Sequence, residues 1–232
     1  MGGLAWILVR RNFGSITFSG YHRPRGVLNA AFFAFNISAE NVNSGLDKAL
    51  LVRLDTLAVA GIYGAAYRAV EITLVPLWAL LMPAEVVMFK AGAASRYAVQ
   101  LELRAHLNVA TPYAIFAGIA LYFCAPLLPV LLSSQYKSSV PVVQLLAVFP
   151  LLYSTRAALG IALAGFGEQR YRAIANAIGV LTLLANLVLI PLYSWEGADY
   201  ATLGVEFVLT LALGARFIRK LSSAESATGA GI

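Results

Sequence analysis

Long apolar segments separated by short polar connections are the feature that most restricts how this chain can fold. A helix that crosses a hydrocarbon core of about 30 Å needs about 20 residues, and each segment approaches or exceeds that length. Pro, Gly and charged residues mark the boundaries. The sequence predicts six membrane-spanning helices, at residues 27–52, 57–85, 109–132, 141–164, 173–193 and 199–218.

Composition excludes the other protein classes. Apolar residues make up 60% of the chain and charged residues 12%, whereas soluble domains carry about 25% charged residues. So few charges cannot cover a water-exposed surface, which excludes a soluble enzyme, a disordered chain and a fibrous protein. We therefore predict an all-α integral membrane protein with a loop region at 1–26, a six-helix transmembrane lobe at 27–220 and a disordered tail at 221–232.

Lysine and arginine indicate the orientation of the predicted helices. With the N-terminal segment in the cytoplasm, three basic residues (Lys48, Arg53 and Lys137) fall outside, and Arg68 and Arg156 fall within helices. The remaining basic residues gather inside, as the positive-inside rule requires. Both termini are then cytoplasmic, and the net charge of +6 needs no nucleic acid to explain it. The inside group consists of Arg10, Arg11, Arg23, Arg25, Lys90, Arg96, Arg104, Arg170, Arg172, Arg216, Arg219 and Lys220.

The longest inside connection, residues 89–108, has two interpretations. Basic and apolar residues alternate in it, which is typical of a short helix lying on the membrane surface. A plain basic loop retained in the cytoplasm accounts for the same pattern.

A polar stripe along the first predicted helix is the strongest indication of a functional site. Five polar residues lie within about 40° of one line, over 18 residues or about 27 Å of helix. Charged groups are costly in lipid, so the stripe must face either a water-filled cavity or neighbouring helices that it bonds. We favour the cavity. The stripe consists of Asn29, Asn36, Glu40, Asn43 and Asp47.

Two arginines within predicted helices are further cavity candidates. Arg68 follows Tyr67 and stands three residues before Glu71, so it either faces a cavity or forms a structural ion pair with Glu71. A guanidinium suits phosphate, which it binds through two parallel hydrogen bonds. Arg156 is the second cation. Small residues around Gly61 and Gly64 predict a close approach between helices.

The sequence holds no pattern of catalytic chemistry. It contains no phosphate-binding loop, no dinucleotide fingerprint and no nucleophile elbow. The single cysteine, Cys124, and the two histidines, His22 and His106, have no partners at metal-ligand spacing. We expect a carrier without cofactor, metal or chemical catalysis.

Several segments of the sequence together indicate a family. They are Leu46–Leu51 with Ala60–Arg68, Leu127–Phe149, Ala164–Arg172 and Asn186–Tyr193 with the residues that follow it. Each of them alone is weak, but they follow one another in order over about residues 25–220. Together they resemble Wzx-type polysaccharide exporters, the O-antigen flippases of the multidrug/oligosaccharidyl-lipid/polysaccharide superfamily.

The resemblance implies a flippase that moves undecaprenyl-diphosphate-linked oligosaccharide across the bacterial inner membrane by alternating access. Family members have two six-helix lobes around a cationic cavity, and this chain is similar to the second lobe only. The resemblance therefore implies a C-terminal half that lacks its N-terminal lobe, with residues 2–9 as the end of a preceding helix. It places Arg68 at the family's Tyr-Arg position, and polymerases or glycosyltransferases are possible partners.

Two other functions stay open at this point. A cation-coupled multidrug antiporter of the same superfamily would use an acidic cavity, which Glu40 and Asp47 allow and the two arginines disfavour. An inactive membrane remnant, or a scaffold that binds other enzymes through its basic loops, needs no cavity.

Overall fold

The computed structural model describes residues 45, 47–178 and 180–229, and within these ranges its secondary structure is helical without strands. The predicted all-α class is confirmed, while most of the expected first helix, 27–52, lies outside the described residues. A helical segment at 47–54 is followed by α3 (Leu57–Ala94), α4 (Arg96–Cys124), η1 (Ala125–Leu127), α5 (Leu128–Leu131), η2 (Ser134–Ser138), α6 (Ser139–Leu145), η3 (Leu146–Val148), α7 (Phe149–Gly165), α8 (Gln169–Ile178) and α9 (Val180–Gly229).

Four stretches of the described chain are long and apolar enough to cross a membrane. They are Leu57–Ala94, Arg96–Leu131, Ser134–Gly165 and Leu181–Ser222. The predicted count of six stays a prediction. The last stretch covers two predicted spans, and α9 continues to Gly229, through most of the segment predicted as a disordered tail.

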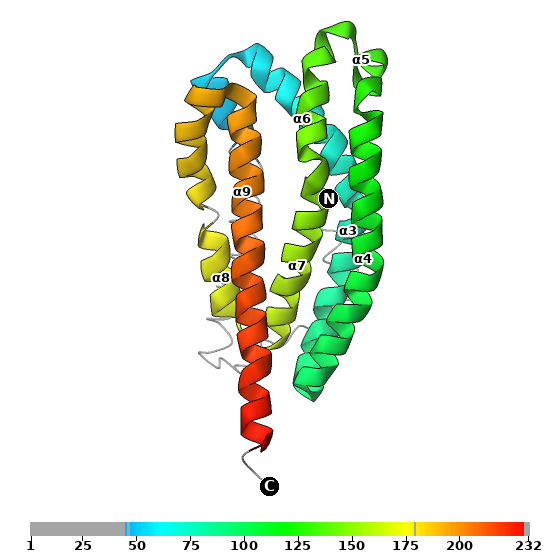
Figure 1. The fold of residues 1–232 in the computed structure, drawn as a ribbon, viewed down its shortest axis with the longest axis vertical. Helices are drawn as coiled ribbons and strands as arrows, with labels where there is room; N and C mark the ends of the chain where they lie inside the picture. The colour runs from blue at the N-terminus through cyan, green and yellow to red at the C-terminus, as the bar shows by residue number, and fades with distance from the viewer. Residues whose placement is uncertain (1–44, 46, 179, 230–232) are drawn as a thin grey trace, which may run out of the picture.

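A reversal at Ser194 divides α9 into two arms, which Figure 1 shows turning back at one end of the bundle. Ser194 has φ 57° and ψ −134°, which are not helical values. Its hydroxyl donates a hydrogen bond to the carboxylate of Asp55, just before α3. Gly197 permits the tight turn, since a Cβ atom there would lie 2.2 Å from the carbonyl oxygen of Leu189. The break falls between the two predicted spans.

The junction of α3 and α4 differs from both interpretations of residues 89–108. α3 continues to Ala94 and α4 begins at Arg96, so this region consists of the ends of two long helices. Ser95 separates them and caps α4 by accepting a hydrogen bond from the Ala98 amide at 3.0 Å. The 38 residues of α3 extend about 57 Å, well beyond a hydrocarbon core of about 30 Å.

α7 lies at the centre of the described bundle. In the stretch Ser134–Gly165, which ends with α7, half of the most apolar part is buried inside the bundle, against 22% in each of the other three stretches. Alanines and Gly165 on α7 let neighbouring backbones approach, as is usual where helices pack in lipid. A Cβ atom on Gly92 of α3 would lie 1.9 Å from the carbonyl oxygen of Gly165. No described atom lies within 4 Å of a Cβ atom built on Gly61 or Gly64, so the close approach that the structure describes is elsewhere.

The described basic residues form two groups, one toward each end of the bundle, as the sequence predicts. One end of the bundle carries the α3–α4 junction, the α7–α8 turn and the end of α9, where most of the described basic residues lie. The opposite end carries the Ser194 reversal, the helical segment 47–54, which contains Lys48 and Arg53, and η2, which contains Lys137. This separation is compatible with a multi-pass membrane protein.

Candidate functional site

A cavity of about 210 Å³ opens between four helices of the bundle, with charged and aromatic side chains in an otherwise apolar wall. Such a mixture is typical of ligand sites, where a few polar groups set orientation within an apolar pocket. Its lining comprises Trp78, Leu81, Met82 and Glu85 of α3, Tyr153, Arg156, Ala157, Gly160 and Ile161 of α7, Arg172 of α8 and Leu213 of α9.

Both arginines of this cavity are paired with carboxylates. Arg172 donates from Nη1 to Glu85 Oε1 at 2.7 Å, and Arg156 donates from Nε to Glu206 Oε2 at 2.6 Å. The Arg156 and Glu206 side chains are 7% and 15% exposed, so this second pair is largely removed from solvent. A buried pair of this kind holds its geometry only while both members remain, because either charge alone is costly.

Aromatic side chains complete the wall beside the arginines. Trp78 donates its indole N–H to the Tyr153 hydroxyl at 3.0 Å. The guanidinium carbon of Arg156 lies 5.3 Å from the centre of the Tyr153 ring, within the range of a cation–π interaction. These contacts fix the Tyr153 ring between α3 and the Arg156 guanidinium.

A second group of charges surrounds Glu71 of α3. Lys48 Nζ lies 3.0 Å from Glu71 Oε1, and Arg68 Nη1 lies 2.8 Å from Glu71 Oε2. The Lys48 ammonium also lies 3.9 Å from the centre of the Tyr67 ring. The Arg68 side chain is 80% exposed, so it does not line the cavity that holds Arg156.

One face of α3 connects the two charged groups. Glu71, Trp78 and Glu85 are spaced by seven residues, which places each within about 20° of the last on a helix. They extend over about 21 Å of helix axis at 1.5 Å per residue. We name these three residues and their partners Lys48, Tyr153 and Arg172 the α3 track. The track covers much of a bilayer core in depth.

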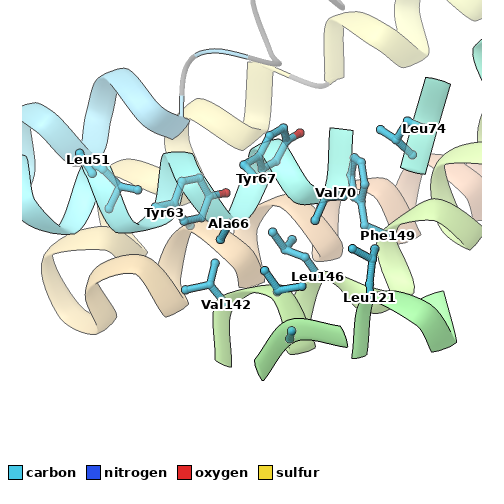
Figure 2. Packing of buried hydrophobic residues seen from close by; sticks show 14 of the residues in the cluster. Leu51, Tyr63, Ala66, Tyr67, Val70, Leu74, Leu121, Val142, Leu146 and Phe149 are labelled. Carbon is cyan, nitrogen blue, oxygen red and sulfur yellow. The ribbon is translucent and has the colours of Figure 1, made fainter. Parts of the chain in front are cut away.

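A series of aromatic rings in contact, one pair stacked and two pairs tilted, runs from α3 to α7 inside the bundle. Ring centres lie 5.9 Å apart between Tyr63 and Tyr67, 6.2 Å between Tyr67 and Phe149, and 5.9 Å between Phe149 and Tyr153. Figure 2 shows Tyr63 and Tyr67 projecting from α3 into the cluster that contains Phe149. The rings support the track from behind and carry the Lys48 and Arg156 cations on their faces.

Buried polar groups beyond the track lie toward the end of the bundle that holds the Ser194 reversal. The Asp47 carboxylate accepts from the Tyr63 hydroxyl at 2.8 Å and from the Lys48 amide at 2.7 Å. Asp199 is completely buried, and neither of its carboxylate oxygens has a hydrogen-bond partner among the described residues. Asp47 and Asp199 are thus two buried carboxylates, and of the two only Asp47 has hydrogen-bond partners among the described residues.

Glu168 links three segments at the basic end of the bundle. It lies in the turn between α7 and α8, where it accepts from Lys220 at 2.5 Å and from Arg216 at 2.8 Å, both on α9. Arg96 at the start of α4 donates to the Lys220 carbonyl at 3.3 Å. The hydrogen bonds from Lys220 and Arg216 hold the pKa of the Glu168 carboxyl below its usual range. This turn is therefore tied to α9 by charge.

The structure brings together part of the predicted site. Tyr67, Glu71 and Arg68 adjoin Lys48, and the predicted Arg68–Glu71 ion pair is present. Arg156 lies in the cavity, apart from this group. Asp47 is buried against Tyr63. The remaining stripe residues, Asn29, Asn36, Glu40 and Asn43, lie outside the described residues.

Sequence reasoning missed the partners that complete the site. Lys48 and Arg172 are assigned to opposite membrane surfaces by charge alone, yet both pair with carboxylates of α3. Glu206 of α9 is the counter-charge of Arg156. The seven-residue spacing of Glu71, Trp78 and Glu85 is a signal in the sequence that could have identified this face of α3.

Comparisons with protein-family models, with curated proteins and with solved structures find no significant match for the chain. Among the described residues, no three His, Cys, Asp or Glu side chains gather as a metal site. The arrangement suits non-covalent binding. Arginine and lysine donate hydrogen bonds to anionic groups, while the aromatic rings and carboxylates suit hydroxyl-rich groups.

Proposed function

We propose that this chain is a transmembrane lobe of a flippase that moves undecaprenyl-diphosphate-linked oligosaccharide across the bacterial inner membrane. In this proposal it pairs with a second six-helix lobe, and both of its termini are cytoplasmic. The resemblance to Wzx-type exporters supplies the substrate class, and the residues of the bundle supply the physical support.

The α3 track is the observation that carries the proposal. Ionisable side chains within membrane-spanning helices are costly, and they usually mark a path for a polar or charged substrate. Here they follow one face of a single helix for about 21 Å, with Lys48 and Arg172 toward its two ends. An anionic diphosphate that moved along this face would meet a cation in each half of the membrane.

A reconstituted flipping assay tests the proposal. Purified protein is placed in vesicles that contain undecaprenyl-diphosphate-linked oligosaccharide with a fluorescent label, and a quencher that cannot cross the membrane reports which leaflet the label occupies. In vesicles with an active flippase, nearly all of the label becomes accessible to the quencher with time. In vesicles without flipping, about half of the label stays protected in the inner leaflet. Equal protection in protein-containing and empty vesicles would show that the chain does not flip this lipid.

Charge variants separate a transport role from a structural one. Arg68→Glu and Arg172→Glu should slow flipping by about tenfold or more, since each loss of a charged hydrogen bond removes about 1.5–3 kcal/mol. Arg68→Lys should retain part of the rate. Lys137→Glu is the matched charge reversal in η2, away from the cavity, and should leave flipping unchanged.

A cation-coupled antiporter is the second candidate, and one observation favours it. Asp47 and Asp199 are both buried, and neither carboxylate oxygen of Asp199 has a hydrogen-bond partner among the described residues; buried carboxylates of this kind suit a cation. Uptake of a cationic dye by the same vesicles, without movement of the labelled lipid, would favour the antiporter. Failure of both assays with folded protein would favour a remnant or a scaffold.

A further inference from the structure

The cavity between α3, α7, α8 and α9 holds its arginines in two different ways. Arg172 and its partner Glu85 both line the cavity, so a ligand in the cavity meets the pair directly. Arg156 lines the cavity, but its partner Glu206 does not. An anion that binds the Arg172 guanidinium therefore competes with Glu85, whereas an anion beside Arg156 leaves Glu206 in place.

The described side chains around Glu85 offer no second cation that could replace Arg172 as its ion-pair partner. The charged and titratable groups that share its cavity are Arg172 from α8 and Arg156 with Tyr153 from α7, while α9 contributes Leu213. Arg156 is already bonded to Glu206, and the Tyr153 hydroxyl accepts from Trp78. The Glu85 side chain is only 24% exposed. A carboxylate that loses Arg172 here is left as an uncompensated charge.

Protonation removes that charge. An unpaired ion costs several kcal/mol in weakly polar surroundings, and neutralising it is the usual outcome. Arg172 itself stays charged at any accessible pH, so it can pass from a carboxylate to a phosphate without change. Its side chain lies against α7, where a Cβ atom on Gly160 would be 3.6 Å from Arg172 Nε, so the guanidinium stays in the cavity.

We propose that binding of a phosphate-bearing ligand at Arg172 is linked to the uptake of one proton from solvent by Glu85. The ligand replaces the Glu85 carboxylate on the guanidinium, and the released carboxylate becomes a carboxylic acid. The cavity thus binds an anion and a proton together. This inference rests on the proposed function, because it takes the diphosphate of that substrate as the ligand.

Titration calorimetry with farnesyl diphosphate, on the purified full chain in detergent, measures the linked proton. Repeating the titration in buffers of different ionisation heat gives the number of protons bound per ligand. The diphosphate titrates too, so the informative quantity is the difference between proteins. Wild type should take up about one proton more per ligand than Glu85→Gln. For each unit by which the pH rises, the affinity of wild type for the ligand should therefore fall about tenfold more than that of Glu85→Gln.

Three variants make the result specific to Glu85. Glu85→Asp keeps a carboxylate and should retain the proton. The double variant Arg156→Met with Glu206→Leu removes the other ion pair without leaving a buried charge, and it should also retain the proton, because Glu206 is not the residue displaced. Glu102→Gln, a carboxylate of α4 outside the cavity lining, should behave like wild type. Circular dichroism and gel filtration confirm that each variant is folded before the titration.

The outcomes distinguish this inference from the proposed function. Binding with equal proton numbers in wild type and Glu85→Gln would overturn the proton linkage and leave diphosphate recognition intact. Loss of the extra proton in the Arg156→Met, Glu206→Leu double variant, but not in Glu85→Gln, would assign the exchange to the other pair and also overturn the inference. A folded wild type that binds no farnesyl diphosphate would overturn both.

Discussion

Glu71 and Glu85 lie on the same face of α3, two heptads apart, and each carboxylate is bonded to a basic residue of another helical segment. Lys48 pairs with the first and Arg172 with the second, at 3.0 and 2.7 Å. α3 is thus held by charge at two points that lie 14 residues apart along the helix. Trp78, midway between them, bonds α3 to the central helix α7 through Tyr153.

Removing one member of the Arg156–Glu206 pair should destabilise the bundle strongly. Glu206→Gln leaves the nearly buried Arg156 guanidinium without its counter-charge, which costs about 3–5 kcal/mol. Thermal or denaturant unfolding in detergent measures the change. The double variant Arg156→Met with Glu206→Leu replaces the pair by apolar side chains and should regain most of the loss. A double variant less stable than either single variant would contradict this account.

Gly92 should tolerate no side chain. A Cβ atom there would meet the Gly165 carbonyl oxygen at 1.9 Å, so Gly92→Ala must push α3 and α7 apart. We expect a loss of about 1–3 kcal/mol in the free energy of unfolding, as for other overpacked sites. Gly61→Ala is the matched control on the same helix, since no described atom lies within 4 Å of its Cβ position. Equal effects of the two substitutions would argue against the described crossing.

The link from Glu168 to α9 should weaken in acid. Its pKa is lowered in the folded protein by the hydrogen bonds from Lys220 and Arg216. A lowered pKa stabilises the fold above the unfolded value of about 4.3, and the contribution is lost as the pH falls through the folded value. Thermal unfolding at several pH values measures this contribution. The difference in unfolding midpoint between wild type and Glu168→Gln should stay constant from pH 8 to about 5 and shrink below about 4. A difference that grows in acid would contradict the assignment.

Cysteine labelling should place the two ends of the bundle on opposite sides of the membrane. In a Cys124→Ser background, a maleimide that cannot cross the membrane should modify Lys137→Cys in spheroplasts, because η2 lies at the end predicted to be periplasmic. Ser222→Cys on α9 should react only after permeabilisation. The reverse pattern would invert the orientation, and equal labelling of both sites in intact spheroplasts would contradict opposite locations.

Much of the fold could be predicted from apolar length and charge. The start of α3 after Thr56, the end of α7 at Gly165 and the break between the last two spans all follow from local residue types. The α3–α4 junction was not predicted, because its basic and apolar residues suggested either a short helix on the membrane surface or a basic loop. The two long helices continue through these residues, and the capping hydroxyl of Ser95 is what separates them.

The site was harder to predict, because its partners come from segments far apart in the sequence. Arg68 and Glu71 are three residues apart, and their pair could be predicted from helical spacing. Arg156 and Glu206 are separated by 50 residues, and Arg172 and Glu85 by 87. Only the packing of α7, α8 and α9 against α3 brings these side chains together.

The long helices on either side of Ser95 make this junction a suitable site for a rigid fusion partner. α3 and α4 meet there through a single non-helical residue, so an inserted domain would inherit the orientation of both helices. A rigid fusion partner placed at Ser95 would add mass and shape to a particle that is otherwise hidden within a detergent belt. Electron cryo-microscopy of the purified protein could then align its images on that marker.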